Sequence, residues 1–488
     1  MSRSPVLSVR DSRQLDFFGF ASPASPADRS RPYPTDATAL RLIPFPVTPV
    51  IELPEIQFEQ EPVRPTEPIV PRSTRFQITV ADHLGEGSLR QKCEGNLTAI
   101  ALLKRLEPEG RGATGSELRA LVRYVGWGGL RQVFNAANAG WQDQRQRLEE
   151  LLTSDELASA RATTLNAHYP SPTIIGAIYG ALERFGFLSG RVLEPACGLG
   201  HFLGLMPDGM RSRSTFTGIE IDSLTARLAK ALYPDADLRH SAFEDAKLAD
   251  DFYDVAISNV PFGDYRPFDP RFPRFLIHDY FVAATLAKVR PGGLMAFITS
   301  RGTFEKEEFA LREFVARQAD LLGAIRLPDD AFKRNANTEV TTDIVFLRKR
   351  QAGEARAGPA WQDIVPTTNS LGETILLNEY FAGRPERMLG EMRLAGRMYR
   401  QSEPTWVGNG RDLGEQLHSV LQSLPAAIYQ PVEPPPAVPG VALDVPAPEE
   451  VKPNAFTLHQ GQLAKRQGDQ GRHLPRTHHR GADRTAND

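Results

Sequence analysis

The sequence predicts an α/β protein: a mostly parallel sheet with an antiparallel last strand, preceded by a small helical domain. Between residues 172 and 349, short apolar runs alternate with helical stretches, a pattern typical of a sheet covered by helices on both faces. The last two apolar runs, 321–327 and 341–349, have no obvious long helix between them. We therefore expect these two strands to pair as an antiparallel edge.

The composition fits a soluble globular protein and excludes several other classes. Of the 488 residues, 41% are hydrophobic and 24% are charged, and no apolar run approaches the roughly 18 residues of a membrane span. The first residues contain no apolar stretch of the secretory kind, so a cytoplasmic location is expected. Cys93 and Cys197 are too few for a disulfide scaffold or a four-cysteine zinc site. A net charge of −3 leaves nucleic-acid contacts to local patches.

Shifts in composition divide the chain into five predicted segments. These are a disordered Pro-rich leader (1–75), a helical N-terminal domain (76–163), an α/β domain (164–350), a small helical C-terminal extension (351–425) and a disordered linker with a basic tail (426–488). The two terminal segments are rich in Pro or charge and lack the apolar periodicity from which a core is built.

The predicted helical domain contains sequence patterns that are typical of helices. The apolar residues Leu89, Cys93, Leu97, Ile100 and Leu103 recur at helical spacing. Two further helix starts carry capping-box pairs, Thr114 with Glu117 and Thr153 with Glu156. The segment is therefore expected to form several helices.

The α/β domain begins with a helix that has clear ends. Ser171 is expected to cap it, Pro172 suits its first position, and Gly186 ends it. The expected strands then follow at 191–196, 215–221, 237–242, 253–259, 294–300, 321–327 and 341–349, with helices starting at 200 and covering 223–233, 276–290 and 306–318.

The ends of the first two strands indicate a site for a nucleoside-like ligand. Gly198 and Gly200 follow the first strand and allow a close approach of the backbone, although many α/β proteins use such glycines for packing alone. Glu220 ends the second strand, where an acid can accept hydrogen bonds from both ribose hydroxyls, although an acid at a strand end is more often a solvated turn residue. Ile221 is placed to lie against an adenine ring.

The helix after these glycines does not suit a pyrophosphate. A dinucleotide fingerprint needs a third glycine so that the helix N-terminus can hold phosphate. Here Phe202 and Leu203 occupy the start of the helix. The sequence therefore favours a ligand without a phosphate group.

The fourth expected strand ends in the segment "NVPF", residues 259–262, which is expected to lie at the same edge of the sheet. Together with "LEPACGLG" at 193–200, this segment resembles the motifs of the DNA adenine-N6 methyltransferases in which the cofactor motifs precede the catalytic motif. The resemblance implies the Rossmann-like fold of S-adenosylmethionine-dependent methyltransferases over 164–350. It also implies S-adenosylmethionine as cofactor and adenine N6 in DNA as acceptor.

The resemblance assigns roles to individual residues. Asn259 Oδ1 and the Val260 carbonyl accept hydrogen bonds from the target amine, Pro261 stiffens the loop, and Phe262 stacks on the flipped base. An Asn-x-Pro turn with a surface aromatic is the alternative explanation. The implied cofactor-binding residues are Tyr169, Pro170, Glu194, Pro195, Ala196, Gly198, Gly200, Glu220, Ile221, Phe243 and Asn259. No metal is expected.

The segment after the catalytic motif interleaves cations with aromatic residues. Arg266, Arg271 and Arg274 alternate with Tyr265, Phe268, Phe272 and Phe275. Such a mixture suits phosphate neutralisation and base stacking, although a loop folded on its own aromatics would have the same composition. Phe332 lies where the resemblance places a second stacking aromatic, with an ordinary core phenylalanine as the equal alternative.

A wider resemblance covers about 76–400. The segments "RYVGWGGL", "TLNAHYPSP", "SRGTF" and "NEYFAGRPERMLGEM" are similar to the N-terminal portion of large methylase–helicase proteins of plasmids, phages and mobile elements, of the anti-restriction type. The resemblance implies DNA as a partner, together with a helicase domain or subunit missing from this chain. It leads to the hypothesis that the chain is a truncated or frameshifted product of such a gene.

Three departures from the motifs leave other functions open. Val260 replaces the first proline of the catalytic motif, Pro170 stands where relatives tend to have threonine, and Ala242 stands where many have an acid, for which Glu244 or Asp245 would substitute. One alternative is a methyltransferase acting on an RNA base or a protein glutamine. Another is a non-catalytic, methylase-like module that binds DNA or acts as a scaffold. Cofactor binding separates the enzymes from the non-catalytic module.

Overall fold

A computed structural model describes residues 76–165, 167–333, 340–368, 372–394 and 404–432, together with the backbone of 456–459 and 462–465. The predicted leader (1–75) lies outside the described residues, as does most of the predicted linker and tail. Within that tail, β12 (Phe456–His459) and β13 (Gln462–Lys465) pair antiparallel, where no regular structure was expected.

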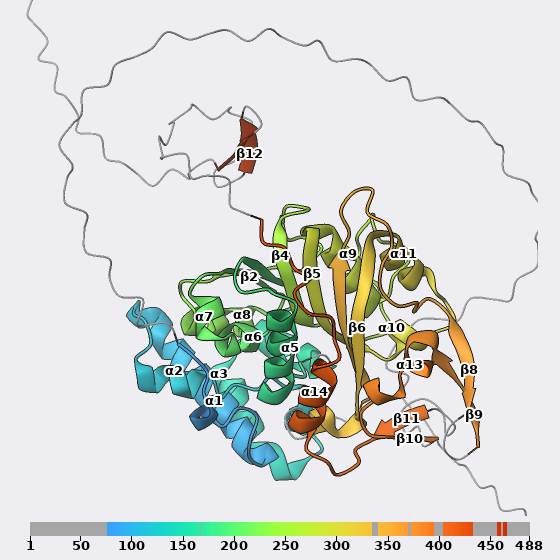
Figure 1. Ribbon diagram of the computed structural model, residues 1–488. Coiled ribbons are helices and arrows are strands. Elements are labelled where there is room, and N and C mark those ends of the chain that lie inside the picture. The colour runs from blue at the N-terminus through green and yellow to red at the C-terminus, as the bar shows by residue number, and fades with distance from the viewer. Residues whose placement is uncertain are drawn as a thin grey trace, which may run out of the picture. The chain divides into compact units, whose positions relative to one another are not determined.

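A seven-stranded sheet forms the centre of the fold (Figure 1), with strand order β3-β2-β1-β4-β5-β7-β6. Its strands are β1 (Arg191–Glu194), β2 (Thr215–Glu220), β3 (Asp237–His240), β4 (Tyr253–Asn259), β5 (Val289–Ser300), β6 (Ala319–Leu327) and β7 (Thr342–Lys349). All pairings are parallel except those of β7 with β5 and with β6. The predicted fold class is confirmed, and the antiparallel β7 lies inside the sheet, where it leaves β6 as the edge.

Helices cover both faces of this sheet. One face carries α5 (Pro172–Arg184), α6 (His201–Leu205), α8 (Ser223–Leu232) and α14 (Leu413–Leu421), and the other carries α9 (Ile277–Lys288) and α11 (Ala310–Gln318). Successive side chains of a strand point to opposite faces, and in β4 Val255 and Ile257 join the first core while Ala256 joins the second. Apolar residues in both registers therefore bury the strand on both faces.

The N-terminal helices pack against the first of these faces. They are α1 (Leu89–Glu109), α2 (Gly115–Leu121), α3 (Gln142–Leu151) and α4 (Ser154–Ala162), with short 3-10 turns η1 (Val80–Asp82), η2 (Gly128–Phe134), η3 (Ala139–Trp141) and η4 (Thr163–Leu165). Both predicted capping boxes form, and Ser88 with Gln91 makes a third at the start of α1.

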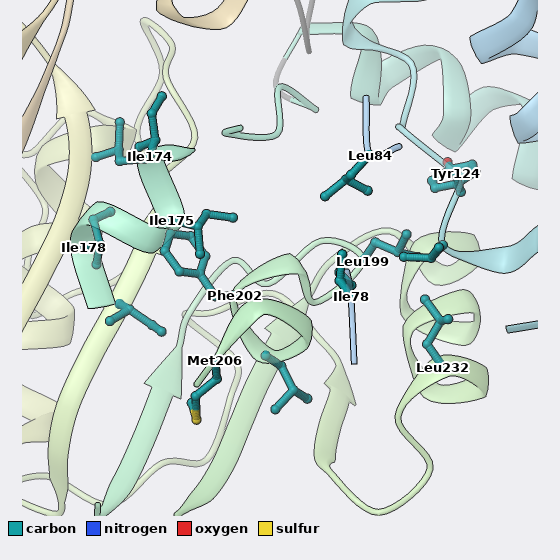
Figure 2. Packing of buried hydrophobic residues seen from close by; sticks show 14 of the residues in the cluster. Ile78, Leu84, Tyr124, Ile174, Ile175, Ile178, Leu199, Phe202, Met206 and Leu232 are labelled. Carbon is teal, nitrogen blue, oxygen red and sulfur yellow. The ribbon is translucent and has the colours of Figure 1, made fainter. Parts of the chain in front are cut away.

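One hydrophobic core joins these helices to the sheet domain. Helices α1, α2 and α4 contact α8, and Figure 2 shows Ile78, Leu84 and Tyr124 in the same cluster as Leu199 and Leu232. The boundary at residue 163 thus lies inside a continuous core, and the predicted division into domains stays a prediction.

The segment 351–425 differs from the helical extension that we predicted. It contains two hairpins, β8 (Ile364–Thr368) with β9 (Thr374–Asn378) and β10 (Glu391–Leu394) with β11 (Pro404–Val407). The segment also contains the short helices α13 (Glu379–Ala382) and η6 (Pro385–Arg387), together with α14. Three further short helices, α7 (Asp208–Arg211), α10 (Gly302–Glu305) and η5 (Asp329–Phe332), belong to the preceding α/β domain. The strands of the two hairpins are only four or five residues long. A segment of that length is too short for its pattern of apolar residues to distinguish a strand from a helical turn.

Arg326 on β6 attaches this extension to the sheet. Its side chain is fully buried and pairs with Asp343 on β7 and with Glu305 on α10. Its guanidinium also lies 4.4 Å from the ring centre of Phe381 and 4.3 Å from that of Trp406. A buried cation thus connects the sheet edge to α13 and β11. None of the helices in the described ranges combines the length and apolar character needed to cross a membrane.

Candidate functional site

The carboxyl ends of three neighbouring strands form the candidate site. Glu194 ends β1, Glu220 ends β2 and Asn259 ends β4, and β1 lies between the other two strands. The order in which the strands are added to the sheet changes side between β1 and β4. The strands β2 and β3 lie on one side of β1, and the later strands lie on the other. Ligands of open α/β sheets bind at such a switch point.

The turn after β1 requires glycine at two positions. Gly198 and Gly200 have φ values of 53° and 82°, which disfavour other residues. A Cβ atom on Gly198 would overlap the ring of Tyr169, and one on Gly200 would lie 2.9 Å from the ring of Tyr233. Sequence analysis identified both glycines, and the structure shows that Tyr169 from the preceding segment lies against this turn.

Glu220 is bound to the glycine turn. Its Oε2 accepts a hydrogen bond from Gly198 N at 2.8 Å, and its Oε1 accepts one from Asp222 N at 2.7 Å. Burial raises the pKa of Glu220 to about 7. The backbone of Ile221 also hydrogen-bonds to the carboxylate, which leaves capacity for a further donor, and the side chain of Ile221 is 69% exposed. This arrangement can accept a ribose hydroxyl beside an apolar surface for a planar base.

Two buried polar side chains near the turn have unsatisfied atoms. Glu194 Oε2 and both ring nitrogens of His201 find no hydrogen-bond partner among the described residues. Burial raises the pKa of Glu194 well above its usual range and lowers that of His201 to about 4. The His201 ring lies 4.7 Å from that of Tyr169. Because an unsatisfied buried polar group costs about 1–3 kcal/mol, these atoms, at the end of β1 and the start of α6, are candidates for hydrogen bonds to a ligand.

The side chain of Asn259 has a defined orientation. Its Nδ2 donates a hydrogen bond to the carbonyl oxygen of His168 at 2.6 Å. Its Oδ1 is buried and has no partner within the described chain. The contact with His168 therefore fixes the amide so that the oxygen stays available as an acceptor. Sequence analysis missed His168, because the contact uses a backbone atom that has no sequence signal.

After Asn259, the catalytic motif is anchored to β5 through Val260. Val260 N donates to the carbonyl oxygen of Ile298 on β5 at 3.1 Å, and the valine side chain is buried. Pro261 and Phe262 follow as half-buried residues. The valine that replaces proline thus adds a backbone hydrogen bond that a proline could not make.

The helical region supports His168 through a glycine-rich turn. Asn96 on α1 is fully buried, accepts from Val125 N at 2.8 Å and donates to the Gly126 carbonyl at 2.7 Å. Two residues later, a Cβ on Gly128 would overlap the Ala167 carbonyl and lie 2.7 Å from the His168 ring. The turn therefore packs closely against the segment that orients Asn259.

The predicted nucleic-acid loop is divided into two parts. Arg271 is exposed, but its guanidinium binds Asp269 through Nε and Nη2, at 3.2 and 3.0 Å, and lies 5.4 Å from the Phe272 ring. Its predicted contact with nucleic acid stays a prediction. Phe272 and Phe275 stack on each other and pack against Tyr280 and Phe314, so this half is folded on its own aromatics. Arg266, Arg274, Tyr265 and Phe268 are exposed.

Phe332 is a correction. Its side chain is 2% exposed and belongs to the first hydrophobic core, so it has no free face for a base. Phe243 is also buried and stacks on Phe281 at 5.2 Å. Its predicted cofactor contact stays a prediction, as do those of Pro170, Pro195 and Ala196.

Comparison with known proteins gives one curated relative. No family model matches the chain. Over 305 residues the chain is 27% identical to the defense against restriction protein B of Escherichia phage P1. The matched region is 61% of this chain but 12% of that relative, so the chain spans about an eighth of the relative's length.

Solved structures with similar folds are distant in sequence. A protein from Listeria monocytogenes described as a class I S-adenosylmethionine-dependent methyltransferase is 18% identical, with a TM-score of 0.36, 55% of this chain covered and 90% of the other. A type I restriction-modification methyltransferase subunit from Streptococcus thermophilus is 15% identical, with a TM-score of 0.33, 52% of this chain covered and 66% of the other. The fold assignment therefore depends on the strand order and pairing described above.

Proposed function

We propose that the chain is an S-adenosylmethionine-dependent methyltransferase that methylates N6 of adenine in DNA. The observation that carries the proposal is the buried, unpartnered Oδ1 of Asn259, which the His168 carbonyl holds in place at the sheet edge. The glycine turn and Glu220 lie at the ends of the neighbouring strands.

The residues at the glycine turn fit S-adenosylmethionine. Glu220 would accept a ribose hydroxyl, with Ile221 beside the adenine. Gly198 and Gly200 admit the ligand close to the backbone. Glu194 Oε2, buried without a described partner, would accept a hydrogen bond from the amino group of the methionine part. When bound, the cofactor supplies a methyl group on a sulfonium centre, which is a strong electrophile.

Asn259 supplies the acceptor that the target amine needs. The lone pair of an exocyclic adenine amine is delocalised into the ring, which makes the amine a poor nucleophile. Hydrogen bonds from its two N–H groups to Asn259 Oδ1 and to the Val260 carbonyl favour a tetrahedral nitrogen with a localised lone pair. The same acceptors stabilise the positive charge that develops on nitrogen during transfer. Phe262 would stack on the flipped base.

Three observations favour DNA as the substrate. Arg266 and Arg274 are exposed beside the catalytic motif, where they can neutralise phosphates. Tyr265, 44% exposed, offers a stacking surface between them and the motif. The name of the phage relative concerns defence against restriction, which is a cleavage of DNA. A helicase partner and an origin by truncation stay predictions.

The proposal is tested by transfer of labelled methyl from S-adenosylmethionine to unmethylated DNA, with the product base identified by mass spectrometry. We expect N6-methyladenine. RNA and a glutamine-containing peptide are offered in parallel. Label in either of these, and none in DNA, would assign the chain to a different substrate. Cofactor binding without transfer to any of the three would overturn the proposed substrate, and absence of binding would leave a non-catalytic module.

The raised pKa of Glu220 gives adenosine binding a pH dependence. In the free protein Glu220 keeps its proton up to about pH 7, and the neutral acid is a poorer acceptor for a hydroxyl. Affinity for adenosine, which does not titrate between pH 6 and 8, is therefore expected to rise with pH. The increase is at most about tenfold per unit below pH 7, and it ends above about pH 8.

Isothermal titration calorimetry at several pH values measures this effect. Glu194 is also buried and its pKa is also raised, so it provides the control. Glu220→Gln should remove the pH dependence, and Glu194→Gln should retain it. A wild-type affinity that stays constant from pH 6 to 8 would contradict the expectation.

Gly128→Ala tests the support that the helical region gives to Asn259. The new methyl group would press on Ala167 and His168, which displaces the carbonyl that orients the catalytic amide. We expect kcat for DNA methylation to fall about tenfold or more, since small misplacements at a reacting centre are costly. The KM for the cofactor should change less. Gly112→Ala, where nothing lies within 4 Å of the new Cβ, is the matched control, and equal kcat values for the two variants would contradict the prediction.

A further inference from the structure

Phe268 is an exposed aromatic residue on a well-anchored loop. Its side chain is 89% exposed, nine positions after Asn259 along the chain. A single exposed apolar side chain is common on protein surfaces. What distinguishes Phe268 is the structure of the loop that carries it.

The residue after Phe268 is bound tightly to the loop core. Asp269 is 6% exposed, and its carboxylate accepts hydrogen bonds from the backbone and guanidinium of Arg271 and from the hydroxyl of Tyr280. Phe272 packs on Phe275 and Tyr280 below it. These contacts form a small core that holds the chain immediately after Phe268.

The loop is also closed on the other side of Phe268. Tyr265 accepts a hydrogen bond from Ile277 N, the first residue of α9, at 2.8 Å, and Arg266 Nε donates to the Arg274 carbonyl at 3.3 Å. The phenyl ring of Phe268 thus projects between two fixed points. The exposed cations Arg266 and Arg274 belong to the same loop.

We propose that Phe268 is a wedge that enters the DNA base stack beside the target adenine and occupies the space that the flipped base leaves. The inference rests on the proposed function and adds to it the residue that opens the duplex. Removing a base from the stack costs a few kcal/mol, and apolar side chains inserted between bases can hold a duplex in a distorted form. Phe262, which is half-buried in the catalytic motif, remains the residue for the flipped base itself.

The loop suits this role in shape and in charge. Because it is anchored on both sides, little conformational entropy is lost when the ring enters the stack. A base–aromatic contact contributes about 1–3 kcal/mol, which is comparable to the cost of flipping. The two arginines can hold the phosphates on either side of the opened base pair.

The test compares Phe268→Ala with the wild type on two DNA substrates. One is a duplex, and the other has the same sequence with the target adenine in a single strand, which needs no flipping. We expect kcat/KM of the variant to fall at least about tenfold on the duplex and less than about twofold on the single strand. With 2-aminopurine at the target position of the duplex, the wild type should raise its fluorescence and the variant should not.

Two further variants control the result. Phe309→Ala removes another aromatic, 56% exposed and just before α11, and should behave as wild type on both substrates. Phe268→Trp keeps a stacking ring and should retain most of the duplex activity. An equal loss of Phe268→Ala activity on both substrates, or no loss on either, would overturn the wedge while leaving the proposed function intact. A wild type that methylates neither DNA would overturn both.

Discussion

Asn259→Ala is expected to reduce DNA methylation by about 10²- to 10³-fold or more while the protein stays folded and binds S-adenosylmethionine. The substitution removes the side-chain acceptor that we propose for the target amine, and loss of a single preorganised group that stabilises developing charge has effects of this size. Asn259 Nδ2 makes one hydrogen bond, to His168, so the cost in stability is small by comparison. Initial rates of labelled methyl transfer measure the effect.

Two further substitutions distinguish this role from a general effect of losing an amide. Asn135→Ala removes an exposed asparagine whose Oδ1 accepts a hydrogen bond from the nearby Ala137 N, and its rate should equal that of the wild type. Asn259→Asp keeps the acceptor oxygen but places its second oxygen, in place of Nδ2, against the His168 carbonyl, so its rate should lie between those of alanine and wild type. An alanine variant with more than about a third of the wild-type rate would exclude Asn259 as the amine acceptor.

Arg326→Met is expected to lower the free energy of unfolding by about 3–5 kcal/mol. Arg326 is fully buried with Asp343 and Glu305, which are 0% and 6% exposed as side chains. Removal of the cation leaves the buried Asp343 carboxylate without its partner and Glu305 with its contact to Arg301 alone. Breaking a buried ion pair in this way is much costlier than losing a surface pair. Urea unfolding, followed by tryptophan fluorescence, measures the change, since Trp406 packs on Arg326.

The matched control removes an exposed ion pair. Arg317 pairs with Glu313 on the surface of α11, at 63% and 46% exposure, so Arg317→Met should cost less than about 0.5 kcal/mol. The triple variant Arg326→Met, Asp343→Leu, Glu305→Met should recover much of the lost free energy of unfolding, because a buried ion pair can be replaced by apolar residues of similar size. A single Arg326→Met variant as stable as Arg317→Met would show that the buried charges are not coupled.

The sequence by itself determined the elements of the α/β domain and their class. Apolar runs such as 253–259 and 294–300 are continuous because their strands are buried on both faces, and this pattern is local. Helix caps at Thr114, Thr153 and Ser171 are also local, since each cap bonds residues within one turn. For the same reason the positions of Gly198, Glu220 and Asn259 at strand ends could be predicted from strand order alone.

Only the tertiary structure decided which side chains are available to a ligand. Phe332 has the chemistry of a base-stacking contact, but the core buries it, and Arg271 is held in an ion pair by Asp269. The orientation of Asn259 depends on His168, 91 positions away along the chain. The type of a residue determines which interactions its side chain can make, whereas the groups that it contacts come from segments that are distant in sequence. Contacts between such segments depend on the packing of the whole core, which no local sequence pattern encodes.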